Sequence, residues 1–113
     1  MKNIVFDTNF LIYIAKYQID LFSEIERICS FSYSLNVLSG TIEELEKVKP
    51  KELNLIKKYL TKFNVIPSEG NVDDALVEYS EKGCIIGTQD RELKKRLKDS
   101  CIVIRQEKYL ELK

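Results

Sequence analysis

The sequence predicts a three-layer α/β/α fold, in which helices cover both faces of a parallel central sheet of about five strands. Short buried strands alternate with segments of helical period along the chain, which is the pattern of βαβ units. No internal repeat, linker or low-complexity stretch divides the 113 residues. The chain is long enough for one hydrophobic core and too short for two, so we expect a single domain over residues 1–113.

The expected elements follow from apolar runs and turn residues. β-Branched and aromatic residues predict a first strand at 3–6, and similar runs predict strands at 33–38, 64–66, 84–87 and 101–104. Helical periodicity indicates helices at 8–17, 20–30, 39–48, 51–63, 71–80 and 91–98. In the segment 51–63, Leu53, Ile56, Leu60 and Phe63 share one stripe, and Pro50 suits the entry to that helix. The stretch IPSEGN at 66–71 is a loop, whereas residues 105–113 are either a last edge strand or a frayed end.

Five parallel strands commonly form a doubly wound sheet that starts in the middle, builds outward one way and then the other. This arrangement gives the order 3-2-1-4-5 and makes the first and fourth strands neighbours. A ligand crevice opens at that switch point, beyond the carboxyl ends of the two strands. Asp7 ends the first strand and Asp90, in GTQD at 87–90, follows the fourth.

The composition excludes several classes of protein. Basic and acidic residues both total 18, so any contact with nucleic acid must come from a local patch. The chain has no histidine, which rules out Ser-His-Asp and Cys-His catalysis and imidazole metal sites. Three unpaired cysteines without C-x-x-C spacing indicate buried, reduced thiols. No stretch has the length of a membrane span or the pattern of a signal peptide, so we expect a cytoplasmic protein without membrane contact.

Two neighbouring carboxylates repel each other unless a cation lies between them. A hard divalent cation, Mg2+ or Mn2+, prefers oxygen ligands and would stabilise Asp7 beside Asp90. Each aspartate could instead have a purely structural role, as the N-cap of the helix that follows it. The sequence alone does not decide between metal binding and capping.

Two further acidic segments are candidates. In the segment 71–80, Asp73 shares a helix face with apolar residues, whereas Asp74 lies further from that face. An acid in the first turn also interacts favourably with the helix dipole, so either residue has an ordinary structural explanation. In the segment 39–48, Thr41 and Glu44 have the spacing of a capping box, so Glu44 is either a cap or a ligand. Spacing alone does not distinguish these roles.

Taken together, VFDTNFLI, TIEELEKV and VDDALVEYSEKGCIIGTQDRELKKRL resemble the successive motifs of the PIN domain family of metal-dependent ribonucleases. The motifs look most like the branch related to ribosomal RNA processing nucleases and less like VapC toxins. The resemblance implies that Asp7, Glu44, Asp73 and Asp90 bind a metal ion and carry out catalysis, with Asp74 as an alternative ligand to Asp73. It implies that Asn9 and Thr88 support them by orienting carboxylates or a bound water. Thr41 departs from the family, which has a hydrophobic residue ahead of the helix acid.

The expected activity is divalent-metal-dependent cleavage of RNA, in ribosomal RNA processing or RNA turnover. A basic segment beside the site can hold flanking phosphates, and its members are Arg91, Lys94, Lys95, Arg96 and Lys98. Tyr13, Tyr17 and Tyr79 either stack on bases or, as helical spacing favours, belong to the core. The resemblance further implies a homodimer, and it leaves open an antitoxin or a ribosome-assembly partner.

Several alternative functions remain. A toxin of a toxin-antitoxin pair would use the same chemistry, and a non-catalytic domain of this fold would bind RNA without cleaving it. Two other enzyme or signalling classes fit the residues less well. A haloacid-dehalogenase-like phosphatase needs D-x-D, but residue 9 is Asn9. A receiver domain needs an aspartate after the third strand, which NVIPSEG lacks.

Overall fold

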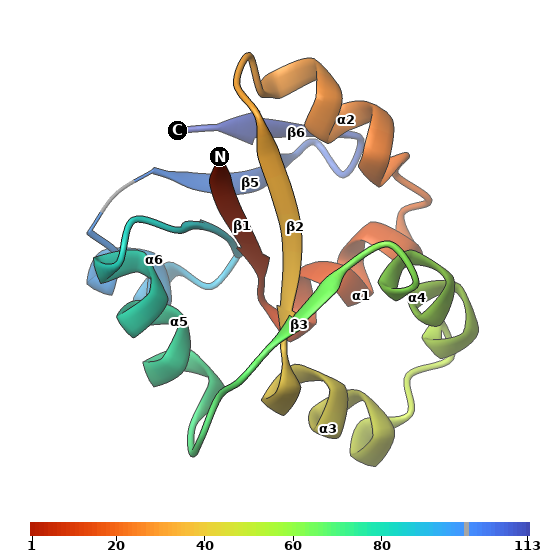
Figure 1. Ribbon diagram of the computed structural model, residues 1–113. Coiled ribbons are helices and arrows are strands. Elements are labelled where there is room, and N and C mark those ends of the chain that lie inside the picture. Colours follow the sequence, from red (N-terminus) through yellow and green to blue (C-terminus); the bar gives the residue numbers. More distant parts are fainter. Residues whose placement is uncertain (99) are drawn as a thin grey trace.

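A six-stranded sheet runs through the middle of the computed structural model, which describes residues 1–98 and 100–113 (Figure 1). The strand order is β3-β2-β1-β4-β5-β6. The strands are β1 (Lys2–Phe6), β2 (Tyr33–Leu38), β3 (Asn64–Ile66), β4 (Ile85–Gly87), β5 (Cys101–Arg105) and β6 (Tyr109–Leu112). The first five pair in parallel, which confirms the predicted order, and β6 pairs antiparallel to β5. The segment left open by the sequence is therefore an edge strand.

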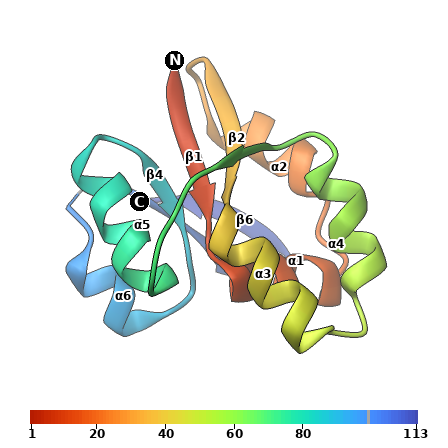
Figure 2. The same cartoon turned by 60° about the horizontal axis from the view of Figure 1, so that its bottom comes forward.

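Helices cover both faces of this sheet. They are α1 (Thr8–Lys16), α2 (Leu21–Ile28), α3 (Ser39–Val48), α4 (Leu53–Leu60), α5 (Val72–Glu81) and α6 (Arg91–Arg96). Figure 1 shows α5 and α6 on one side of the central strands and α1, α2 and α4 on the other. Figure 2 brings forward the end of the sheet where β1 and β2 finish, and α1 and α3 lie side by side there. No helix among the described residues has the length and apolar character needed to cross a membrane.

The alternation of side chains along β1 divides the core into two layers. Ile4 and Phe6 belong to the cluster under α1, α2 and α4, whereas Val5 belongs to the cluster under α5 and α6. All three side chains are fully buried. A strand that is apolar on both faces is what a central parallel strand requires, and it carries the chain directly into Asp7.

Several helix ends differ from the sequence-based expectation. The helix predicted at 91–98 ends at Arg96, because Leu97 adopts extended backbone (φ −79°, ψ 141°) and packs against the α5 and α6 cluster. The Lys98 N–H then donates to the Ser80 hydroxyl at 3.1 Å. The helix predicted at 51–63 covers only Leu53–Leu60, although Phe63 beyond its end is buried as expected.

The three cysteines are free thiols. Cys29 and Cys84 are buried, as predicted, and Cys101 on β5 is half-buried. Burial raises the pKa of the Cys29 and Cys84 thiols, which keeps them protonated and unreactive.

Candidate active site at the carboxyl edge of the sheet

Asp7 is a buried carboxylate at the junction of β1 and α1. Its side chain is only 6% exposed, and its backbone N–H donates to the Gly87 carbonyl at 2.9 Å, which fixes it against the end of β4. Asp7 stands at the N-cap position of α1, yet its side chain makes no capping hydrogen bond. The N-cap alternative is therefore not realised for this residue, and its carboxylate is left for another role.

Thr88 connects Asp7 to Asp90. Its fully buried hydroxyl donates to Asp7 Oδ2 at 3.0 Å and accepts the Asp90 N–H at 3.1 Å. Asp90 does cap α6, since its Oδ1 accepts the N–H groups of Glu92 at 2.9 Å and Leu93 at 3.2 Å. The capping alternative thus holds for Asp90, which also faces the cleft described below.

Glu44 on α3 is held by the start of α1. The helix α3 begins at Ser39 with Leu38 as N-cap, so Thr41 lies inside the helix and does not act as the N-cap that the capping-box alternative requires. Instead, the Thr8 hydroxyl donates to Glu44 Oε1. The Thr41 hydroxyl lies 3.1 Å from Thr8 Oγ1. Thr8 is the donor in both contacts, so Glu44 and Thr41 share its single hydroxyl proton. Thr41, where the sequence departs from the family, therefore lies against the hydroxyl that binds Glu44.

The structure separates the two acids at the start of α5. Asp73 is half-buried and faces the cleft. Asp74 is exposed, and its Oδ1 accepts from Arg96 Nη2 of α6 at 2.6 Å. This geometry favours Asp73 over Asp74 as a site residue.

Hydrogen bonds join the start of α3, the helix that carries Glu44, to the loop that leads into α5. The Gly40 N–H donates to Ser68 Oγ at 2.9 Å, and the Ser68 N–H donates to Ser39 Oγ at 3.0 Å. A Cβ atom on Gly40 would lie 2.9 Å from Ser68 Oγ, so a larger residue here would displace the Ser68 hydroxyl from this hydrogen bond. The loop then enters α5 through Asn71, whose side chain caps the helix by accepting the Asp74 N–H at 3.2 Å.

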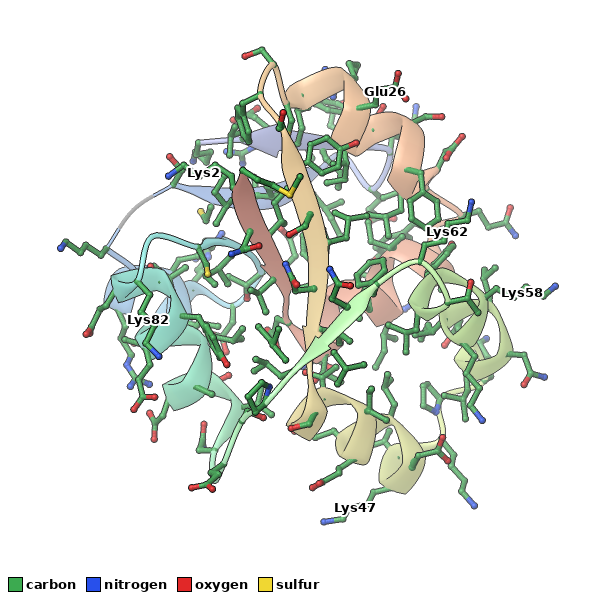
Figure 3. All side chains as sticks on the ribbon, in the orientation of Figure 1. Lys2, Glu26, Lys47, Lys58, Lys62 and Lys82 are labelled. Carbon is green, nitrogen blue, oxygen red and sulfur yellow. The ribbon has the colours of Figure 1, made fainter. Side chains whose placement is uncertain are left out.

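These elements surround a cleft of about 420 Å³. All four acids that the resemblance assigned to catalysis line it, namely Asp7, Glu44, Asp73 and Asp90, and so does the exposed Asn9. The sequence analysis missed Thr8 and Lys47, which also line the cleft, as does Glu43, the residue before Glu44. Lys47 follows Glu44 by three residues on α3, a spacing that places both on one helix face. Figure 3 shows Lys47 extending from α3 at the lower edge of the molecule.

The basic segment lies outside the cleft. Arg91, Lys95, Arg96 and Lys98 are exposed and Lys94 is half-buried, and none of the five lines the cleft in the described structure. Arg96 pairs with Asp74, and Lys95 Nζ lies 3.4 Å from Glu92 Oε1. The segment follows Asp90 directly, so its charges lie on the surface next to the acidic cleft.

The carboxylates influence one another electrostatically. Burial raises the pKa of Asp7 to about 6; the Thr88 hydrogen bond opposes this rise, and the negative charges of Asp73 and Glu44 add to it. Burial also raises the pKa of Asp73, with a further contribution from the charge of Asp90 and an opposing one from Arg96. Uncompensated negative charge is therefore concentrated at this end of the sheet.

The donor set suits a hard divalent cation. It consists of carboxylate oxygens, which magnesium and manganese prefer, and such ions keep several water ligands and need few protein ligands. Within residues 1–98 and 100–113, no three Asp, Glu, Cys or His side chains are close enough together to hold an ion as they stand. Two of the carboxylates are engaged in hydrogen bonds of their own, Glu44 with the Thr8 hydroxyl and Asp90 with the α6 amides.

Comparison with protein families and curated proteins gives consistent matches. The family model described as a PIN like domain matches residues 4–107. Ribonuclease VapC4 of Methanocaldococcus jannaschii is 35% identical, over 99% of this chain and 97% of its own length. Ribonuclease VapC9 of Archaeoglobus fulgidus is 32% identical, over 88% of this chain and 78% of its own.

Solved structures share the fold. The PIN domain endonuclease Utp24 superposes with a TM-score of 0.83 at 18% identity, over 98% of this chain and 90% of its own. VapBC2 from Rickettsia felis, bound to a DNA fragment from its promoter, gives 0.61 at 14% identity, over 84% of this chain and 92% of the matched one. At these identities the likeness concerns the arrangement of strands and helices.

Proposed function

The chain belongs to the PIN-like domain family, and from this premise we propose that it is a divalent-metal-dependent endoribonuclease whose active site is the acidic cleft. The observation that carries the proposal is the convergence of Asp7, Glu44, Asp73 and Asp90 on one cleft from four separate segments of the chain. A buried acid such as Asp7, raised in pKa and free of a capping bond, has no evident structural purpose. The ribonuclease names of relatives above 30% identity support the same activity.

Each acid has a part in this proposal. Asp7 and Asp90 would hold the central ion, with Thr88 fixing the Asp7 carboxylate, and Glu44 and Asp73 would complete its shell or position the attacking water. A bound Mg2+ or Mn2+ supplies an activated water and relieves the negative charge that builds on the phosphate during hydrolysis. Asn9, exposed at the mouth of the cleft, would orient a water or a phosphate oxygen.

The basic residues on and after α6 are proposed to hold RNA flanking the cleft. The protein has no net charge, so attraction of a polyanion must come from such a local patch. Arg91, Lys95 and Lys98 are exposed at its surface and follow directly after Asp90. A strand that enters the cleft would pass these side chains.

Two biological roles fit this activity. The motifs favour a part in ribosomal RNA processing or RNA turnover. The alternative is a toxin that acts with an antitoxin partner, and the VapC names of the two sequence relatives support it. Co-purification of the tagged protein from its native cells would separate the roles. Ribosomal precursors in the purified sample would support RNA processing, whereas a small stoichiometric protein partner would support the toxin role.

The activity is tested with an end-labelled, partly structured RNA, purified protein and Mn2+. We expect cleavage that EDTA abolishes and that Asp7→Asn lowers by more than about 100-fold, since loss of a ligand should exceed the 10- to 100-fold typical of residues around a metal site. Glu44→Gln should be similarly impaired.

Glu46→Gln and Asp74→Asn are the matched controls, because each lies within two positions of a proposed site acid, is exposed and does not line the cleft in the described structure. Both should cleave within a few-fold of the parent. Equal cleavage by the parent and Asp7→Asn, or cleavage that persists in EDTA, would refute the proposal.

A further inference from the structure

Two further hollows lie beside the acidic cleft, near α1. Next to the cleft lies a hollow of about 220 Å³ that shares Asp7, Asn9 and Asp90 with it and adds Tyr13 and Gln89. A third hollow of about 430 Å³ shares Tyr13 and Gln89 with the second and adds Tyr17, Ile104, Gln106 and Glu107. Because neighbouring hollows share lining residues, they form a row from the proposed metal site to Tyr17, and we refer to this row as the groove.

Two tyrosines form an aromatic wall of this groove. The rings of Tyr13 and Tyr17 stack with centroids 5.9 Å apart and an interplanar angle of 12°. Tyr17 is half-buried against the core, but Tyr13 is 36% exposed, although helical spacing placed it in the core. Tyr79, by contrast, packs against the core and donates to the Pro67 carbonyl at 2.6 Å.

The other wall of the groove is fixed in place. The Gln89 side chain accepts the Ile104 N–H at 2.7 Å and donates to the Ile104 carbonyl at 3.2 Å, which ties the β4–α6 connection to β5. Beyond the aromatic pair, Lys16 Nζ lies 5.7 Å from the Tyr17 ring centroid. The groove therefore has a hydrogen-bonded wall and a flat aromatic face, its near end opens on carboxylates, and Glu107 lines its far end.

We propose that Tyr13, backed by Tyr17, is a base-stacking subsite for single-stranded RNA, which receives a nucleobase flanking the scissile phosphate. The inference rests on the proposed nuclease function, because it names how that site positions its substrate. Tyr13 follows Asn9, which lines the cleft, by four residues on α1, or about 6 Å along the helix axis. Any base offers a π-face to an aromatic ring, so this subsite selects unpaired RNA and tolerates different sequences.

The first test measures binding without cleavage. In the Asp7→Asn background, the affinity for a fluorescein-labelled single-stranded oligoadenylate is followed by anisotropy in Mn2+. Tyr13→Ala should weaken binding about 5- to 100-fold, the range expected for loss of one base-aromatic stack. Tyr13→Leu keeps apolar bulk against Tyr17 but has no π-face and should also be weak, whereas Tyr13→Phe should restore affinity. Equal affinities for the alanine, leucine and phenylalanine variants would overturn the inference.

The second test locates the stacked base. A series of oligonucleotides, each with one abasic residue at a different position near the cleavage site, is cleaved by the parent and by Tyr13→Ala. At the position that stacks on Tyr13, the abasic residue and the alanine should each lower kcat/KM, and together they should lower it no further. Additive losses at every position would contradict stacking.

The outcomes keep this inference separate from the nuclease proposal. The nuclease proposal is tested by cleavage with Asp7 intact. Stacking is tested by RNA binding in the Asp7→Asn background, which does not require cleavage, so either proposal can fail while the other holds. Self-association that depends on Tyr13, with RNA affinity unchanged, would assign the groove to a second copy of the chain and overturn the inference. Circular dichroism and the unfolding temperature check that each variant is folded.

Discussion

The Asp7 environment is unfavourable for a charged group in the absence of a cation. Its carboxylate is buried, receives one hydroxyl donor from Thr88, and senses the negative charges of Asp73 and Glu44. A structural aspartate at this corner would instead cap α1, and this one does not. Part of the folding free energy is therefore lost to keep an ionised carboxylate in the cleft.

This environment predicts how stability of the metal-free protein depends on pH. The folded protein holds the Asp7 proton more tightly than the unfolded chain, because the pKa rises from 3.8 to about 6 on folding. Between these pH values the folded state binds more protons, so its stability falls as pH rises and levels off above about pH 6. A shift of this size corresponds to about 3 kcal/mol at neutral pH, as an order of magnitude.

Asp7→Asn removes this titration while keeping a side chain of the same shape. In EDTA, the difference in unfolding free energy between Asp7→Asn and the parent should therefore grow in favour of the variant as pH is raised from about 4 to about 7. Urea denaturation at a series of pH values measures it, with Asp74→Asn, exposed beside Arg96, as the control that follows the parent. A difference that does not change with pH would show that Asp7 is not destabilised when charged.

At the scale of elements, the close packing of β4 on β1 places Thr88 and Asp90 beside Asp7. A Cβ atom on Gly87, the last residue of β4, would lie 2.5 and 2.8 Å from ring carbons of Phe6. The Phe6 ring has little room to move, because it stacks on Phe10 with centroids 5.4 Å apart. Gly87→Ala should therefore destabilise the protein by about 1–3 kcal/mol, as overpacking of a buried site does.

Urea denaturation of Gly87→Ala measures this loss, and a double-mutant cycle identifies its cause. Phe6→Leu removes the ring that the new methyl group meets, so Gly87→Ala should cost less in the Phe6→Leu background than in the parent. An equal cost in both backgrounds would place the strain elsewhere. Activity should fall together with stability, since the strand ends carry the site.

The same elements show which features the sequence could predict. The strands were found because buried parallel strands are continuous apolar runs, and Asp7 and Asp90 followed as residues at the ends of neighbouring strands. Helix ends were less predictable, because the exit of the chain from α6 depends on the packing of Leu97 and on a bond from Lys98 to Ser80. These contacts join residues distant in the sequence, which local propensity does not describe.

As with the fold, only part of the candidate site could be predicted from the sequence. Glu44 and Asp73 were assigned by family resemblance, since spacing alone left a capping box for one and an ordinary first-turn acid for the other. The hydrogen bonds from Thr8 to Glu44 and Thr41 could not be predicted, because they join residues more than 30 positions apart. Tyr13 was misplaced because the stripe of α1 that faces the core is narrower than its run of apolar residues indicated.

At the scale of the whole molecule, charge is balanced in number but not in position. Basic and acidic residues both total 18. In the described structure, however, five acids line the cleft, and Lys47 is the one basic residue among its lining residues. A divalent cation that binds there would lower the repulsion and stabilise the folded state, because the unfolded chain has no such convergence. At a concentration about 100-fold above its Kd, such an ion would add about 2.7 kcal/mol to the unfolding free energy.

We therefore expect Mn2+ to raise the unfolding temperature of the parent by roughly 10 °C, given the entropy of unfolding of a domain of this size. Differential scanning fluorimetry in Mn2+, and in KCl at matched ionic strength, separates specific binding from screening. Asp7→Asn should start from a higher unfolding temperature in EDTA and gain far less from Mn2+, because the substitution removes both the repulsion and a ligand. The stability difference between the two proteins should thus narrow or change sign when the ion is added. An equal gain in both proteins would place the ion away from Asp7 and separate metal binding from the acidic cleft.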